Sequence, residues 1–174
     1  TITYNVTDSS GNAATQKTRT VNVVDTTKPV ITVSGSNPAT IEVGSVYTDA
    51  GATASDNYDG NLTASIVKTG AVNTSTLGSY TITYNVTDSS GNAATQKTRT
   101  VNVVDTTKPV ITVSGANPAT VEVGAVYTDA GATASDNYDG NLTASIGKTG
   151  TVNTAVVGSY TITYNVTDSS GNAA

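Results

Sequence analysis

Aspartate is the abundant side chain in this sequence that could carry out chemistry. The 174 residues include no His and no Cys, so the commonest general base and all thiol chemistry are excluded. Eleven of the 13 acidic residues are aspartates, and all eleven fall in predicted loops or joints. Crowded carboxylates repel one another unless a cation lies among them. Calcium prefers carboxylate, amide and carbonyl oxygens in flexible loops. The residue types therefore favour a calcium site over a catalytic one.

The aspartates gather in three segments that we expect at the same pole of a β-sandwich. These are the start of the first strand, a long loop before the third strand, and a hairpin loop. An extracellular module of this kind binds calcium with a Kd of about 10⁻⁴ to 10⁻³ M. Because the first segment is also the joint between repeats, such an ion would stiffen the joint. The candidate metal ligands are Asp25, Asp49, Asp56, Asp59, Asp88 and Asn92, and in the next copy Asp105, Asp129, Asp136, Asp139, Asp168 and Asn172.

The same aspartates are also compatible with roles that need no metal. Asp-Asn and Asp-Gly pairs form turns on their own. Residues 56–61 resemble the start of an EF-hand loop but lack its closing Glu and flanking helices. Paired carboxylates can hydrolyse glycosides, but no apolar pocket is predicted beside them. We therefore predict no enzyme activity, no catalytic residue, and no cofactor other than structural Ca²⁺.

One stretch of 14 residues recurs unchanged, and its fixed spacing shows that the aspartate-rich loops belong to a repeating unit. It begins at Thr1, Thr81 and Thr161, so the period is 81 − 1 = 80 and 161 − 81 = 80 residues. A fixed period of this length indicates a tandem array. The predicted domains are residues 1–24, the last two strands of a preceding repeat; residues 25–104, a complete repeat; and residues 105–174, a repeat that lacks its final strand.

Each repeat is predicted to be built from short strands. Residues 80–87 alternate apolar and polar side chains with a period of two, as a half-buried strand does. Lys97 and Arg99 are expected to face solvent, and Gly78 followed by Tyr80 predicts a tyrosine corner. The predicted fold class is all-β: tandem immunoglobulin-like antiparallel β-sandwiches. Further strands are expected at residues 30–33, 40–43, 62–66 and 95–104, with weaker segments at 46–48 and 72–77 and a long turn-rich loop over 44–61.

The overall composition excludes two classes of partner. The net charge is −5 and there are only eight basic residues, whereas nucleic-acid binding needs clustered Lys and Arg. No apolar run approaches the length that crosses a bilayer, so no membrane insertion is expected. The absence of Cys removes the disulfide brace of many small secreted domains and leaves room for another brace.

Several motifs together resemble a known family. Asp-Thr-Thr-Lys-Pro-Val-Ile occurs at residues 25–31 and 105–111, and Gly-Ser-Tyr-Thr-Ile-Thr-Tyr occurs at 78–84 and 158–164. With the acidic loop between them, these motifs resemble the bacterial immunoglobulin-like surface repeats found in pesticidal crystal proteins and large adhesins, which are related to hyalin repeats. The resemblance covers essentially the whole chain. It implies an extracellular location at the bacterial cell surface, and it does not imply an enzyme or name a ligand.

The expected function is structural: a spacer, stalk or filament segment of an extracellular bacterial adhesin or surface fibre, stiffened by calcium. Its partners would be the neighbouring repeats of the same chain. Residues 15–24 have the sequence of residues 95–104, so they could fill the place of the missing final strand of residues 105–174 in a second molecule, head to tail. The alternative is a glycan- or ligand-binding module that uses Tyr58 and Tyr138. The sequence identifies no glycan and no host receptor.

Overall fold

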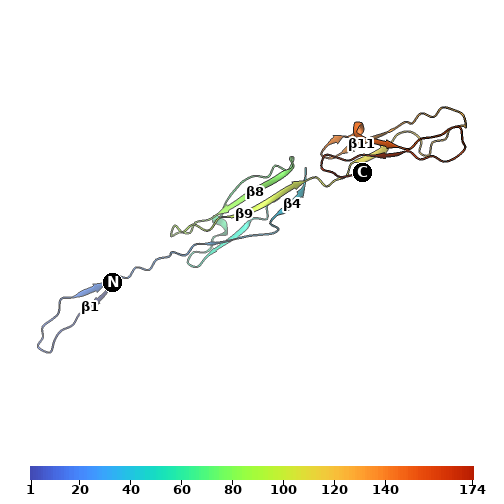
Figure 1. Cartoon of the computed structure of the whole chain (residues 1–174). Helices are drawn as coiled ribbons and strands as arrows, with labels where there is room; N and C mark the ends of the chain where they lie inside the picture. Colours follow the sequence, from blue (N-terminus) through green and yellow to red (C-terminus); the bar gives the residue numbers. More distant parts are fainter. The chain divides into compact units, whose positions relative to one another are not determined.

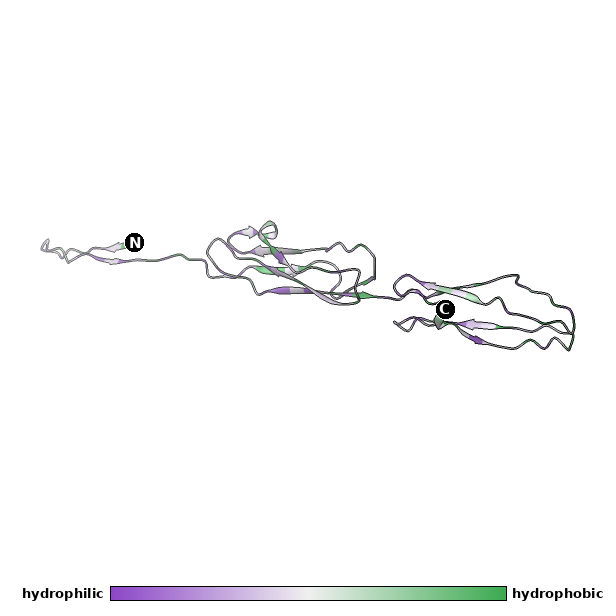
Figure 2. Ribbon diagram, turned by 90° about the horizontal axis from the view of Figure 1, so that it is seen from above, coloured by the Kyte–Doolittle hydropathy of each residue, from purple (hydrophilic) through white to green (hydrophobic).

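The computed structural model describes all 174 residues, and its regular structure consists of strands and two short 3-10 turns (Figure 1). The all-β class is therefore confirmed. The chain forms two compact units: residues 1–34, 52–68 and 84–97 make the first, and residues 35–51, 69–83 and 98–174 make the second. Along single strands, polar and apolar residues both occur (Figure 2), as expected when only one face is buried.

The first unit contains a hairpin and a three-stranded sheet. The hairpin pairs β1 (Ile2–Tyr4) with β2 (Lys17–Arg19), and every residue in it is exposed. In the sheet, β5 (Ala52–Asp56) lies between β3 (Val30–Val33) and β6 (Gly60–Asn61), with antiparallel pairing on both sides. Ile31 lies opposite Ala54, and both side chains are buried.

A four-stranded sheet follows the order β4 (Ala39–Glu42), β9 (Lys97–Val104), β8 (Gly78–Asn85) and β7 (Val67–Thr69). In Figure 1, β9 lies between β4 and β8. Val101 and Val103 of β9 are buried, as are Ile82 and Tyr84 of β8. The pairing of β4 with β9 is parallel, with Ala39 opposite Val101 and Glu42 opposite Val104, which departs from the expected antiparallel pairing.

Residues 105–174 repeat part of this structure. β11 (Ala132–Asp136) lies between β10 (Val110–Val113) and β12 (Gly140–Asn141), and β13 (Gly147–Thr149) pairs with β14 (Thr163–Asn165). Residues 119–122, the counterpart of β4, are not a strand. In the preceding repeat β4 pairs with β9, whose counterpart would lie beyond residue 174. Val123 is 60% exposed, whereas its counterpart Val43 is 7% exposed.

The predicted strand at residues 62–66 is wrong, because a 3-10 turn (Thr63–Ser65) occupies this segment. Side-chain hydrogen bonds explain the difference. The amide oxygen of Asn61 accepts the N–H of Thr63 at 2.9 Å, and the hydroxyl of Thr63 accepts the N–H of Ala54 at 3.1 Å. These local bonds compete with strand pairing. The segment Thr143–Ser145 forms the same turn one repeat later.

The long loop predicted over residues 44–61 is partly wrong, because it contains β5 and β6. The strand was hidden because its inward residues are alanines, which have low β-propensity and give no apolar alternation. The weak segments at 46–48 and 72–77 are not strands; regular structure lies instead at β7. The predicted strand at 15–24 is limited to β2.

The sequence also predicted a tyrosine corner at Tyr80 and a solvent-facing side chain at Arg99. The tyrosine-corner prediction agrees with the structure: the hydroxyl of Tyr80 donates to the carbonyl of Thr76 at 2.9 Å, and Tyr160 repeats this bond to Val156. The prediction that Arg99 faces solvent is wrong, because its side chain is only 3% exposed. Its carboxylate partner is described below.

Candidate metal centre

Two groups of three aspartates form the candidate metal centres. In each group, one carboxylate oxygen of every residue lies within 4.8 Å of the other two. Each group takes one residue from each of the three segments that the sequence singled out: the joint, the long loop and the hairpin loop. The first group is Asp25, Asp56 and Asp88, and the second is Asp105, Asp136 and Asp168.

The hairpin loop fixes Asp88 through Asn92. The backbone N–H of Asn92 donates to Oδ1 of Asp88 at 2.7 Å, and its side-chain amide donates to Oδ2 at 2.8 Å. The same amide also donates to the backbone carbonyl of Asp25 at 3.3 Å. Asn92 therefore ties the hairpin loop to the joint by hydrogen bonds of its amide nitrogen. Asn172 makes the same three bonds to Asp168 and Asp105.

Asp56 uses its two carboxylate oxygens differently. Oδ1 accepts the backbone N–H groups of Tyr58 at 2.8 Å and Asp59 at 3.1 Å, which closes a turn. Oδ2 is buried and has no hydrogen-bond partner. Asp136 repeats this arrangement, with the same turn on Oδ1 and a buried, unpartnered Oδ2. Turn formation therefore accounts for one oxygen of each aspartate and not for the other.

The joint aspartates show the same division of roles. Oδ1 of Asp105 accepts the N–H of Thr107 at 3.2 Å, and Oδ1 of Asp25 accepts that of Thr27 at 3.0 Å. Oδ2 of both joint residues is buried without a partner. A buried charged oxygen that lacks a hydrogen bond is costly. Each cluster thus contains two such oxygens, which a bound cation would satisfy.

The electrostatics of the second cluster favour a cation. Asp105 is 7% exposed, and this burial raises the pKa of its carboxyl group, as do the nearby charges of Asp136 and Asp168. Burial acts in the same direction on Asp168, but hydrogen bonds from Asn172, Ser170 and Gly171 together outweigh it and hold the pKa of Asp168 below its usual value. The negative charges of these neighbours therefore disfavour the charged form of Asp105, and a divalent cation among the three carboxylates would relieve this repulsion.

The donor set fits calcium better than a transition metal. All candidate ligands are hard oxygens, and the chain contains neither His nor Cys. Calcium takes about six to eight oxygens, so water or backbone carbonyls would have to complete the shell. The three aspartates of each cluster would hold the ion, which would supply only charge neutralisation and a cross-link between three segments.

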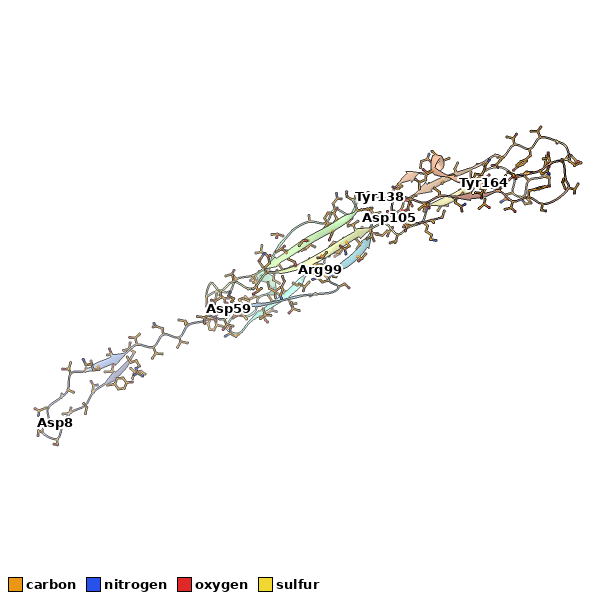
Figure 3. All side chains as sticks on the ribbon, viewed as in Figure 1. Asp8, Asp59, Arg99, Asp105, Tyr138 and Tyr164 are labelled. Atoms are coloured by element: carbon orange, nitrogen blue, oxygen red, sulfur yellow. The ribbon has the colours of Figure 1, made fainter.

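Asp49 and Asp129 are not brought into the clusters. Asp49 pairs with Nε of Arg99 at 3.3 Å, and both side chains are buried. The guanidinium of Arg99 (labelled in Figure 3) also donates to the carbonyl of Gly51 at 3.2 Å. The strand alternation alone predicted that Arg99 faces solvent. The sequence therefore contained no sign of the buried ion pair between Arg99 and Asp49.

In the following repeat, Asp129 has different partners. It accepts hydrogen bonds from the hydroxyl of Tyr164 at 2.6 and 2.7 Å and pairs with the exposed amine of Lys148 at 3.2 Å. The bond from Tyr164 holds the pKa of Asp129 below its usual value, and the same bond raises the pKa of Tyr164 to about 12.

Asp59 and Asp139 connect two loops by hydrogen bonds. The carboxylate of Asp59 accepts the N–H of Ser89 at 2.6 Å and the hydroxyl of Ser89 at 2.7 Å. Asp139 makes the same pair of bonds to Ser169. Both residues lie outside the groups of three and hold the hairpin loop against the long loop beside each cluster.

Tyr58, the candidate residue for stacking on a glycan, is 74% exposed.

Comparison with known proteins identifies the family. The family described as "Bacterial surface protein, Ig-like domain" matches residues 31–103 and 111–174. The chain is 32% identical to hyalin of Strongylocentrotus purpuratus over 99% of its length, and 33% identical to a pesticidal crystal protein of Bacillus thuringiensis over 78%. It spans only 15% and 20% of these relatives.

Among solved structures, a lipoprotein of Bacteroides thetaiotaomicron is similar, with 29% identity, a TM-score of 0.40, and coverage of 45% of this chain and 39% of that one. No helix in the chain is long and apolar enough to cross a membrane. The two family matches cover most of the sequence and coincide with the two repeats. The chain belongs to the family of bacterial surface protein Ig-like domains, with the tandem β-sandwich fold of that family.

Proposed function

We propose that this chain is a structural segment, a spacer or stalk of an extracellular bacterial adhesin or surface fibre, in which each repeat is braced by one calcium ion. Membership of a surface-domain family supports the location. The observation that carries the calcium role is the set of buried carboxylate oxygens without hydrogen-bond partners at Asp25, Asp56, Asp105 and Asp136. An enzymatic role is not proposed, because each clustered aspartate already holds a turn through one of its carboxylate oxygens.

The position of the clusters suggests how an ion would stiffen the array. Asp25 and Asp105 immediately precede the Thr-Thr-Lys-Pro joint of each repeat. Pro restricts its own φ and disfavours helical geometry in the residue before it, so the joint is already short and extended. An ion held by the joint, the long loop and the hairpin loop would remove the remaining freedom of the joint. In this role calcium replaces the disulfides that the chain lacks.

Calcium is therefore expected to raise the thermal stability of the chain. One site adds roughly 1.4 kcal/mol at a calcium concentration ten times the Kd, since binding is restricted to the folded state. The measurement is thermal unfolding followed by circular dichroism, in 10 mM CaCl₂ and in excess chelator, with NaCl at matched ionic strength as the control. Superimposable curves in the two conditions would contradict the calcium role.

A glycan-binding module is the alternative from another class. It is supported only by the exposed ring of Tyr58 and its counterpart Tyr138, which is 39% exposed. A single tyrosine in each repeat gives a small surface for stacking on a sugar, so we favour the structural role.

We further propose that residues 105–174 can accept a strand from a second molecule. A groove of about 680 Å³ in this repeat has a mixed lining, in which polar residues such as Asn117 and Asp129 stand beside the apolar side chains of Val121, Tyr160 and Ile162. Among their counterparts in the preceding repeat, Ile41 lies in β4, and Tyr80 and Ile82 lie in β8, both strands of the β9 sheet. The groove would take a strand with the β9 sequence from whichever chain supplies it.

Residues 15–24 have that sequence, and their apolar side chains are available. Val21 and Val23, the counterparts of the buried Val101 and Val103, are 58% and 95% exposed. Arg19 corresponds to Arg99 and would meet Asp129, as Arg99 meets Asp49. Such pairing joins molecules head to tail without closure, which gives a fibre.

Chain association is expected to depend on these residues. The 174-residue chain should form concentration-dependent oligomers in size-exclusion chromatography with light scattering. A variant with Val21→Asp and Val23→Asp should be monomeric. A wild-type chain that stays monomeric at millimolar concentration would reject the strand exchange and leave the calcium role untouched.

A further inference from the structure

Glu42 forms a clamp on the two threonines that follow Asp105. Its Oε1 accepts the N–H of Thr106 at 3.0 Å, the N–H of Thr107 at 3.1 Å and the hydroxyl of Thr107 at 2.7 Å. Its Oε2 accepts the N–H of Thr106 at 3.1 Å and the hydroxyl of the same residue at 2.8 Å. One carboxylate therefore accepts four different donors from two consecutive residues. Charge-assisted bonds of this kind are stronger than neutral ones.

The sheet holds Glu42 in place for this role. Glu42 is the last residue of β4 and lies opposite Val104, the last residue of β9. The N–H of Val43 donates to the carbonyl of Val104 at 2.7 Å, which continues the pairing by one step. The N–H of Thr106, and then the hydroxyl of Thr107, lower the pKa of Glu42 to about 2, so the clamp is ionised at neutral pH.

The clamp and the second cluster share a donor. The N–H of Thr107 lies 3.1 Å from Oε1 of Glu42 and 3.2 Å from Oδ1 of Asp105. Asp105 is thus held between Val104, which pairs with β4, and two threonines fixed by Glu42. Its Oδ2 remains buried and unpartnered within the cluster. Fixing a ligand in its bound position before binding lowers the entropic cost of binding.

We propose that Glu42 is a positioning residue for the calcium site of the following repeat, so that its removal weakens calcium binding at the site of Asp105, Asp136 and Asp168 and leaves the site of Asp25, Asp56 and Asp88 unchanged. This inference rests on the proposed calcium role. It couples neighbouring repeats, because a residue of one repeat sets the affinity of the next. The coupling needs no direct contact between Glu42 and the ion.

Calorimetric titration with CaCl₂ tests the coupling in full-length chains in which one site has been removed. Asp56→Asn leaves the second site to be measured, and Asp136→Asn leaves the first. In the Asp56→Asn chain, Glu42→Ala is expected to weaken calcium binding roughly fivefold or more, a coupling of ordinary size. Glu42→Gln keeps one acceptor oxygen and should weaken it less. Glu122→Ala makes the same change at the corresponding residue, which has no threonine partners, and should have no effect.

The Asp136→Asn chain separates coupling from a general loss of structure. Glu42 belongs to the same repeat as the first site, so a merely structural effect of Glu42→Ala would weaken that site. The proposal predicts that the first site keeps its Kd while the second loses affinity. Equal Kd values with and without Glu42 in the Asp56→Asn chain, or equal weakening of both sites, would overturn the role of Glu42 but leave the proposed calcium role standing. Absence of calcium binding to any of these chains would overturn the proposed calcium role as well.

Discussion

Replacement of Asp49 by Asn is expected to destabilise the repeat of residues 25–104 by about 3 to 5 kcal/mol, because it leaves the buried guanidinium of Arg99 without its carboxylate. A loss of this size is a large part of the stability of a small domain. The measurement is urea unfolding followed by circular dichroism, with calcium held at one concentration throughout.

Two further variants identify the cause of this destabilisation. Asp129→Asn, the same change one repeat later, should cost much less, because its charged partner Lys148 is 53% exposed. The double change Asp49→Leu with Arg99→Met should recover most of the lost stability, because buried ion pairs are commonly replaceable by apolar side chains. If Asp49→Asn cost no more than Asp129→Asn, the buried pair would not be the main stabilising contact of this strand.

Replacement of Asp56 by Asn is expected to change stability in opposite directions with and without calcium. The amide oxygen of Asn can still accept the N–H groups of Tyr58 and Asp59, so the turn survives. Only the buried, unpartnered Oδ2 is changed. In chelator the variant should be more stable than the wild type, because one repelling charge is gone. In 10 mM calcium it should lose the roughly 1.4 to 2.7 kcal/mol that one occupied site supplies at ten to a hundred times the Kd.

Asp8→Asn is the matched control for this prediction. Asp8 has the same local sequence as Asp88 and makes the same bonds to its asparagine, Asn12, but it belongs to no group of three. Its replacement should leave the calcium response unchanged. Thermal unfolding of both variants in both conditions gives the comparison, and an equal calcium response in Asp56→Asn and wild type would count against the site.

The fold class was predictable because periodicity and repetition are local signals. The alternation in residues 80–87 and the 80-residue period needed no knowledge of the packing. β5 was missed because its inward positions are alanines, whose burial depends on the partner strand β3. The turn at Thr63–Ser65 was missed because its stability comes from the side chains of Asn61 and Thr63, which an apolar pattern does not reveal.

For the candidate site, the sequence predicted the three segments correctly but not which aspartates of the long loop join the clusters. Joint, long loop and hairpin loop do contribute one aspartate each to every cluster. The sequence could not separate Asp56 from Asp49, because both precede turns in the same loop. Their difference depends on Arg99, which reaches Asp49 from a strand 50 residues later. The clamp by Glu42 was not predicted either, since it depends on the parallel pairing of β4 with β9.

Calorimetric titration of the wild-type chain with CaCl₂ tests the calcium role most directly. Two ions should bind to each chain with Kd values of about 10⁻⁴ to 10⁻³ M. The chain with both Asp56→Asn and Asp136→Asn should bind none, while its circular dichroism spectrum stays that of the wild type. An absence of binding heat with the wild-type chain at 10 mM calcium, or the same binding curve in the double variant, would contradict the assignment of these aspartates as calcium ligands.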